Sequence, residues 1–188
     1  MERPYVLHMF TPGKQMSPFD VNMAADAGWQ IIVPYAEVGA ESIAAMTQDT
    51  IFSRGPKGAL RSGIFIGGRD VMLAQDMADK ARAAMFKPFV VSLMADPSGA
   101  FTTAAAMVAC VDAALLRVHG VGLAQRRVLI VGGTGPVGRI AGVMAAQLGA
   151  LVTLAGRSAP SSEQAARERF AIELFNRVSP DVVLIDIM

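Results

Sequence analysis

A glycine-rich turn between an apolar run and a helical pattern constrains the fold of this chain more than any other feature. Residues 128–131 are wholly apolar, which is typical of a strand buried on both faces of a parallel sheet. Gly133, Gly135 and Gly138 follow with the G-x-G-x-x-G spacing, and apolar residues then recur at helical spacing from 137 to 148. A strand–turn–helix context makes this spacing a prediction of a dinucleotide-binding unit, with a purely structural glycine turn as the alternative.

Each position of this turn has an expected role. Gly133 allows the tight turn, Gly135 lets the backbone approach a pyrophosphate, and Gly138 lets the helix and strand pack closely. Pro136 suits the first helical turn, whose free N–H groups and positive dipole end face the phosphates. The predicted cofactor-binding residues of the turn are Gly133, Thr134, Gly135, Pro136, Val137 and Gly138.

The end of the next apolar run, residues 151–155, is expected to select the nucleotide. An acidic residue there would bind the ribose 2′-hydroxyl of NAD, whereas an arginine accommodates a 2′-phosphate. The sequence has Arg157 followed by Ser158, and a guanidinium can bind phosphate through two parallel hydrogen bonds. NADP is therefore the favoured cofactor. NAD binding and a solvated surface arginine are the alternatives.

Composition excludes several classes of protein. The chain has 188 residues, of which 53% are hydrophobic and 18% charged, so a packed core is expected. The net charge of +1, without a Lys/Arg run, predicts no binding to nucleic acid. The one cysteine, Cys110, allows no internal disulfide and no cysteine-based metal site, and its Ala-rich surroundings suggest a small core residue. No membrane span or secretory pattern is expected, which predicts a cytoplasmic protein.

Apolar runs and helical patterns alternate along the whole chain. This alternation predicts an α/β fold with parallel sheets in both halves: a domain at residues 1–118 that includes a connecting helix, and a Rossmann-type NADP-binding domain at 119–188. Residues 51–56 have no clear period and are expected to be a strand end and loop. The expected strands are 5–10, 29–34, 64–66, 89–94, 128–131, 151–155 and 181–188, and the expected helices are 18–27, 40–46, 70–85, 102–118, 137–148 and 162–178.

The loops that follow the strands of the first half contain the other candidate site residues. Ligands of open α/β sheets bind at the carboxyl ends of the strands, which is where these loops lie. Each candidate also has a plainer interpretation as a turn residue or a helix cap. The candidates are Lys14, Ser17, Asp20, Arg54, Lys57, Asp70, Asp96, Ser98, Thr102 and Thr103.

Several of these motifs together resemble a known family. Residues 19–21, 50–55, 64–68 and 102–106, with the glycine turn at 133–138 and residues 156–158, are similar to the NAD(P)-dependent methylene-tetrahydromethanopterin dehydrogenases of methylotrophic bacteria. The resemblance implies an N-terminal domain that binds a reduced pterin and faces a Rossmann domain across a cleft. It also implies oxidation of the methylene carrier to the methenyl cation, a step of formaldehyde oxidation. Folate-dependent relatives share this layout, so methylene-tetrahydrofolate is the alternative carrier.

The implied reaction suggests roles for the candidates. Hydride transfer to nicotinamide needs aligned carbons and a carboxylate near the developing positive charge, and it needs no metal or nucleophile. Asp20 is the first choice for that carboxylate and Asp96 the second. Thr102 and Thr103 are expected to orient the pterin or the nicotinamide. The remaining candidates other than Asp70 are assigned to substrate binding, with Lys57 and Arg54 proposed for anionic or polar parts of a substrate tail.

The last part of the chain departs from the family pattern. Only the first half of a Rossmann domain is expected, since the sequence ends after the strand predicted at 181–188. That strand also resembles the third strand of response-regulator receivers, with Asp186 as the phosphate acceptor. Its apolar character at a sheet edge predicts a homo-oligomer. The alternative functions are a non-catalytic NADP-binding or assembly protein and a pterin or folate reductase.

Overall fold

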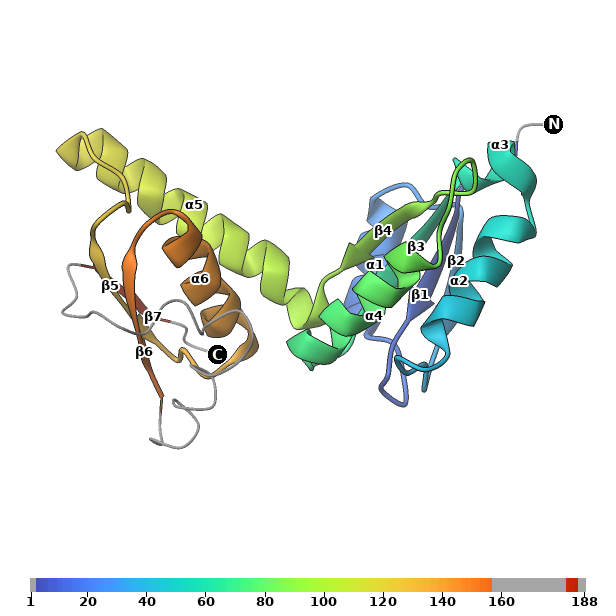
Figure 1. The fold of residues 1–188 in the computed structure, drawn as a ribbon, viewed down its shortest axis with the longest axis horizontal. Coiled ribbons are helices and arrows are strands. Elements are labelled where there is room, and N and C mark those ends of the chain that lie inside the picture. The colour runs from blue at the N-terminus through green and yellow to red at the C-terminus, as the bar shows by residue number, and fades with distance from the viewer. Residues whose placement is uncertain (1–2, 157–181, 186–188) are drawn as a thin grey trace. The chain divides into compact units, whose positions relative to one another are not determined.

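The computed structural model describes residues 3–156 and 182–185, and these fold into two compact units (Figure 1). The first unit is residues 1–98 and the second is residues 99–188. This division falls between Ser98 and Gly99, whereas the sequence predicted a boundary near residue 118. The reason is that the long helix α5 (Ala100–His119) packs against helix α6 (Pro136–Gln147) of the second unit.

The first unit is a four-stranded parallel sheet with helices between successive strands (Figure 1). Its strand order is β2-β1-β3-β4, so β1 pairs with β2 on one side and with β3 on the other. The elements are β1 (Val6–Phe10), α1 (Pro18–Asp26), β2 (Ile31–Tyr35), α2 (Ile43–Phe52), α3 (Gly55–Ala59), β3 (Ser62–Ile66), α4 (Val71–Ala83) and β4 (Ser92–Ala95).

Two apolar clusters hold this sheet to its helices. Alternate residues of a strand point to opposite faces of a sheet. Phe10 of β1 accordingly packs with Ile64 and with Met77 of α4, and all three side chains are almost fully buried. Leu7 lies in the other cluster, against which the partly buried Trp29 packs. Burial of each such side chain stabilises the fold by about 1.5–3 kcal/mol.

Helix α4 forms as the sequence pattern indicates. Its buried residues recur at helical spacing and include Ala74 and Met77. The Asp70 carboxylate caps the helix, accepting hydrogen bonds from the backbone N–H groups of Met72 and Leu73 at 3.0 Å each. The cap satisfies two of the N–H groups that a helix start leaves without an intrahelical partner.

The prediction of a strand end and loop at residues 51–56 is wrong. Helix α2 continues to Phe52, and the short helix α3 follows at once. The side of α2 that faces the core includes Thr47 and Thr50, whose hydroxyls donate to carbonyl oxygens one turn earlier at 2.8 and 2.9 Å. These internal hydrogen bonds let the threonines occupy buried helical positions, so the apolar period was hidden by polar residues.

The second unit contains a three-stranded parallel sheet with the order β6-β5-β7. A short 3₁₀ turn, η1 (Pro97–Gly99), precedes α5 at the junction of the units. The strands are β5 (Arg127–Val131), β6 (Leu151–Ala155) and β7 (Val182–Ile185). The two parallel sheets confirm the predicted α/β class. The predicted helix at 162–178 lies outside the described residues.

Helix α5 differs from expectation in two ways. Only Ala100, Ala104 and Val108 are buried along it, and Cys110 is exposed, so the prediction of a core cysteine is wrong. Contrary to the sequence expectation, residues 97–119 are also long and apolar enough to cross a membrane, with a mean hydropathy of 1.7 over the best window. This criterion uses only helix length and composition, and core helices of soluble proteins satisfy it as well. The many alanines explain both findings, because alanine is apolar yet tolerates exposure.

We expect Ile64→Ala to destabilise the first unit by about 2–5 kcal/mol, because it leaves a cavity beside Phe10 and Met77. The matched control is Leu60→Ala, since Leu60 is 79% exposed and its truncation should change stability by less than about 0.5 kcal/mol. Urea unfolding followed by the fluorescence of Trp29, the single tryptophan, reports on this unit. Equal losses in the two variants would contradict the assignment of Ile64 to the core.

Candidate active site

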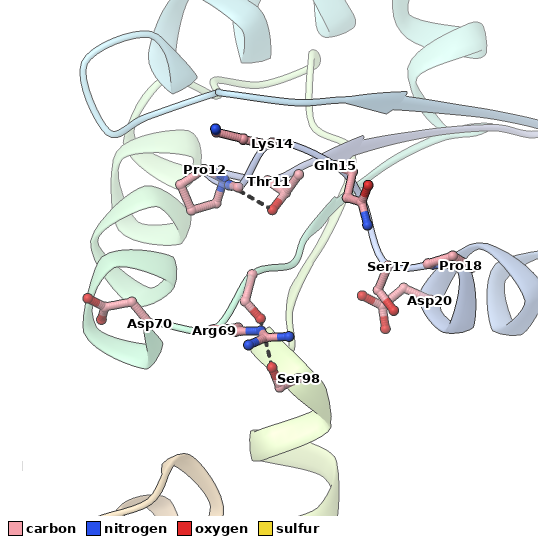
Figure 2. Close-up of a pocket in the computed structure, with 12 residues that line it drawn as sticks. Thr11, Pro12, Lys14, Gln15, Ser17, Pro18, Asp20, Arg69, Asp70 and Ser98 are labelled. Carbon is pink, nitrogen blue, oxygen red and sulfur yellow. Dashed lines mark hydrogen bonds between the residues drawn. The ribbon is translucent and has the colours of Figure 1, made fainter.

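The first unit has a cavity of about 580 Å³ at the carboxyl ends of β1 and β3 (Figure 2). One wall is the loop that leaves β1, and the other is the loop that leaves β3, with Ser98 following β4. A volume of this size is in the range of small-molecule sites. The lining residues are Thr11, Pro12, Gly13, Lys14, Gln15, Ser17, Pro18, Asp20, Gly68, Arg69, Asp70 and Ser98.

The strand order explains why the cavity lies here. From β1 the chain crosses to β2 on one side, and the next strand, β3, then pairs with the opposite side of β1. The order therefore reverses between β1 and β3, and a crevice opens where the two loops diverge. Ligands of open α/β sheets bind at such a point, so this cavity is the candidate active site of the first unit.

Local hydrogen bonds hold the two loops in place. The buried Thr11 donates its backbone N–H to the carbonyl of Tyr35 at 3.0 Å, and its hydroxyl oxygen accepts from the N–H of Gly13 at 3.2 Å. On the other wall, the Ser98 hydroxyl donates to the carbonyl of Gly68 at 3.0 Å (Figure 2). The loops are thus built into the sheet through backbone contacts, while most of the lining side chains stay available to a ligand.

Two glycines after β3 let the walls approach each other. Gly68 has a φ of +122°, which side-chain-bearing residues rarely adopt, and a Cβ there would lie 3.2 Å from the ring of Pro12. A Cβ on Gly67 would lie 3.3 Å from a carboxylate oxygen of Asp20 and 3.1 Å from the sulfur of Met16. The pair of glycines therefore makes room for the Asp20 carboxylate beside the end of β3.

Asp20 is the electrostatically unusual group of this site. Burial raises the pKa of its carboxyl above the usual value, and the negative charge of Asp96 raises this pKa further. Asp96 directly follows β4, is only 6% exposed, and donates its backbone N–H to the carbonyl of Ile66 at 3.0 Å. The two carboxyl groups at this edge of the sheet favour a ligand that brings a positive charge or hydrogen-bond donors.

The structure brings part of the predicted set together. Lys14, Ser17, Asp20 and Ser98 line the cavity, and Asp96 interacts with Asp20 from β4. Thr102 and Thr103 begin α5 in the other unit, where the Thr102 hydroxyl donates to the carbonyl of Gly99 at 3.3 Å. The functional roles of all these residues stay predictions.

Arg54 and Lys57 lie at the opposite edge of the sheet. The Arg54 guanidinium donates to the carbonyls of Pro4 and Arg61 at 2.8 and 3.0 Å, and to the hydroxyl of Ser62 at 3.1 Å. These partners mark the amino ends of β1 and β3, so Arg54 joins two strands there, and Lys57 lies on the adjacent helix α3. Arg54 and Lys57 had suggested a ligand site because residues 51–56 were expected to be a strand end and loop, whereas the structure has the end of α2 and the helix α3 there.

Two cavity residues, Gln15 and Arg69, were missed by the sequence analysis. Both lie in loops that directly follow predicted strands, as do the candidates that line the cavity. Their position directly after a predicted strand could therefore have identified both as cavity residues. Neither residue belongs to a family motif, and the motif at 64–68 ends one residue before Arg69.

The glycine turn of the second unit has the predicted strand–turn–helix geometry. Strand β5 ends at Val131, and α6 begins at Pro136 with Gly135 as its N-cap in an extended conformation. A Cβ on Gly138 would lie 2.6 Å from the carbonyl oxygen of Gly132, which confirms that helix and strand pack too closely there for any side chain. The backbone N–H groups at the start of α6 thus face outward from a cradle without side chains, which fits a pyrophosphate.

The role expected for Gly133 needs a correction. The positive φ of this turn, +78°, belongs to Gly132. Gly133 is needed for a different reason: a Cβ there would lie 2.7 Å from the Cβ of Leu154 on the neighbouring strand β6. Thr134 accepts a hydrogen bond at its carbonyl from Arg139 at 2.7 Å. The predicted nucleotide-selecting residues, Arg157 and Ser158, lie outside the described residues.

Within 3–156 and 182–185, no group of three or more His, Cys, Asp or Glu side chains could hold a metal ion.

Comparison with known proteins identifies the first unit. Residues 18–98, which include Asp20, Asp96 and both glycines of the β3 loop, match the family described as methylene-tetrahydromethanopterin dehydrogenase, N-terminal. The match continues beyond this segment, because the chain is 50% identical over 151 residues to a protein of Methylorubrum extorquens named NAD(P)-dependent methylenetetrahydromethanopterin dehydrogenase. The chain is therefore similar to methylene-tetrahydromethanopterin dehydrogenases over most of its length. The resemblance of its motifs is thereby confirmed.

The chain spans about half the length of the relatives it matches. The aligned segment covers 80% of this chain and 51% of the 50% identical relative. A second protein of Methylorubrum extorquens, named Bifunctional protein MdtA, is 33% identical over 172 residues, which are 90% of this chain and 58% of that protein. Among solved structures, NAD⁺-bound 3-phosphoglycerate dehydrogenase of Entamoeba histolytica has a TM-score of 0.30 at 12% identity, covering 82% of this chain and 55% of that one.

We expect Asp20→Asn to change the pH dependence of stability. Because the pKa of Asp20 is raised in the folded protein, its ionisation opposes folding, and stability is lost as the pH rises from its usual pKa through the raised value. The variant lacks this loss, so its melting temperature relative to wild type should increase from about pH 3 to about pH 6. Asp76→Asn, on the exposed side of α4, is the control for removal of a charge. A difference that stays constant over this range would refute the burial of the Asp20 charge.

A second variant tests the close packing in the glycine turn. Gly138→Ala should destabilise the second unit by about 1–3 kcal/mol and weaken NADP binding, because the added Cβ meets backbone atoms of Gly132 and Gly133. Gly142→Ala, one turn later on α6, is the matched control. Its Cβ would meet only the ends of side chains, those of Leu154 at 3.1 Å, Ile130 at 3.6 Å and Val152 at 3.7 Å, and alanine favours the helix by about 1 kcal/mol. Thermal melts and NADP titrations that rank the two variants equally would argue against this packing.

Proposed function

We propose that this protein transfers a hydride from methylene-tetrahydromethanopterin to NADP, or to NAD, and so forms methenyl-tetrahydromethanopterin in the oxidation of formaldehyde. The observation that carries the proposal is the cavity at the switch point of the first sheet, which contains Asp20 and is lined partly by the segment that matches the family and partly by the loop that precedes it. The glycine turn of the second unit supports the choice of a dinucleotide as hydride acceptor. Cytoplasmic location and self-association stay predictions.

The proposed reaction suits the residues of the cavity. A hydride leaves the bridging methylene carbon with its electron pair and adds to the nicotinamide ring, and the adjacent nitrogen lone pairs stabilise the remaining cation. Atoms and charge balance without a proton transfer, a nucleophile or a metal. The protein has to align the two carbons and to stabilise the positive charge as it develops.

Asp20 is the proposed charge-stabilising group. A carboxylate whose ionised form is poorly solvated gains more from a nearby cation than one in bulk water, because the surrounding medium screens the attraction less. Asp96 adds a second negative charge from the interior of the sheet edge. We assign Lys14, Ser17 and Ser98 to substrate binding, and Thr102 and Thr103 to orientation of the pterin or the nicotinamide.

The proposed cofactor site is the turn from Gly133 to Gly138. The cradle left by the glycines would hold the pyrophosphate against the N-terminus of α6. Arg157 and Ser158 are proposed to select NADP through its 2′-phosphate. When bound, the dinucleotide accepts the hydride, while the residues of this chain position it.

Absorbance at 340 nm tests the reaction directly. Purified protein is incubated with methylene-tetrahydromethanopterin or methylene-tetrahydrofolate, each with NADP and then with NAD. Pterin-dependent formation of NADPH or NADH is the expected result, and the four combinations determine the carrier and the cofactor. NADP binding without turnover on either carrier would favour the alternative of a non-catalytic NADP-binding protein.

We expect Asp20→Ala to lower turnover by about 10²-fold, which is the size of effect seen when one charge-stabilising group is removed from an active site. The dissociation constant for NADP should not change, because Asp20 lies in the first unit and the glycine turn in the second. Asp76→Ala is the control for removal of an aspartate elsewhere in the same unit. Parallel losses of turnover and of NADP affinity would show that Asp20 acts on folding and not on the reaction.

A further inference from the structure

The charged groups of the cavity are separated along its length. Figure 2 shows Asp20 and Ser17 toward one end, Asp70 toward the other, and Arg69 between them. Lys14 lies on the β1 wall, on the side away from Asp20 (Figure 2). The cavity therefore has carboxylates toward both ends in this view, with Arg69 between them and Lys14 on the β1 wall.

Both cations are available to a ligand. The side chains of Lys14 and Arg69 are exposed, and neither has an ion-pair partner among residues 3–156 and 182–185. The acidic neighbour of Arg69 is occupied otherwise, because a carboxylate oxygen of Asp70 accepts two backbone N–H groups of α4. Two cations that line one cavity repel each other unless an anion lies between or beside them.

We propose that Lys14 and Arg69 bind the acidic tail of the reduced-pterin carrier, while its ring system lies toward Asp20. This inference rests on the proposed function and extends it to a part of the substrate that does not react. Tetrahydromethanopterin and tetrahydrofolate both carry ionised groups on their tails. A guanidinium binds carboxylate or phosphate through two parallel hydrogen bonds, and an ammonium adds a mobile point charge.

The positions of Lys14 and Arg69 also indicate at which end of the sheet the tail would bind. Arg54 and Lys57 were the cations predicted for it, yet they lie at the amino ends of the strands, on the other edge of the sheet from the cavity. Arg69 lies at the correct edge because it directly follows the glycines after β3. The substrate would then lie along the cavity with its cation-forming end and its anionic end on complementary charges.

Binding measurements with and without the tail test this assignment. Isothermal titration calorimetry would compare three probes: tetrahydromethanopterin and tetrahydrofolate, which have different acidic tails, and 6-methyltetrahydropterin, which has none. Arg69→Gln and Lys14→Gln should each weaken the two tail-bearing probes roughly fivefold, as expected for loss of one exposed ion pair, and the double variant by more. The affinity of 6-methyltetrahydropterin should not change.

The matched control is Arg82→Gln, which removes an exposed arginine from α4 that pairs only with Asp79 at 2.8 Å in the described structure. It should leave all three affinities unchanged. The wild-type affinity for the tail-bearing probes should also fall with rising salt, since the proposed contacts are exposed.

Several results would overturn the assignment. They are an equal loss for probes with and without a tail, no loss for any probe, or wild-type protein that binds neither tail-bearing probe. Tail-dependent binding without NADPH formation would refute the proposed hydride transfer and leave the tail site standing. If NADPH forms and the KM for the carrier is the same in Arg69→Gln as in wild type, the hydride transfer stands and the tail site is refuted.

Discussion

The parallel pairing of β1 with β2 on one side and β3 on the other is the constraint on which the first unit depends. It places the carboxyl ends of both neighbours at one edge of the sheet, so the loops that follow β1 and β3 must diverge there. The cavity, its polar lining and the position of Asp20 all follow from that divergence. The clusters around Phe10 and Leu7 hold helices on both faces and keep this edge in register.

Both units use glycines to bring two backbone segments close together at the end of a strand. After β3, Gly68 adopts a positive φ and lies against Pro12, and in the second unit Gly138 lies against the backbone of Gly132. At each position a Cβ would separate two segments that have to touch. The result is a cavity in one unit and a turn without side chains in the other, each at the end of a parallel strand.

The electrostatics of the first unit depend on placing like charges near one another. Burial and the nearby charge of Asp96 disfavour the ionised form of Asp20, and the cations Lys14 and Arg69 line the same cavity. A protein tolerates such an arrangement when a ligand neutralises both parts. The proposed substrate has this distribution of charge in its product form, with a cation on the ring system and anions on the tail.

Local patterns in the sequence determined much of this protein. The glycine turn at 133–138, the alternation of strands and helices, and the apolar stripe of α4 each need only neighbouring residues, so the α/β class and the helix after the turn could be predicted. The C-terminal part of helix α2 was missed because its buried threonines carry their own hydrogen bonds. Only the tertiary structure decided that Arg54 joins strands at one edge while Arg69 reaches the cavity at the other, and that Cys110 is exposed. The physical reason is that a sheet edge and a helix face are defined by strand order and packing partners, which contacts between distant residues set.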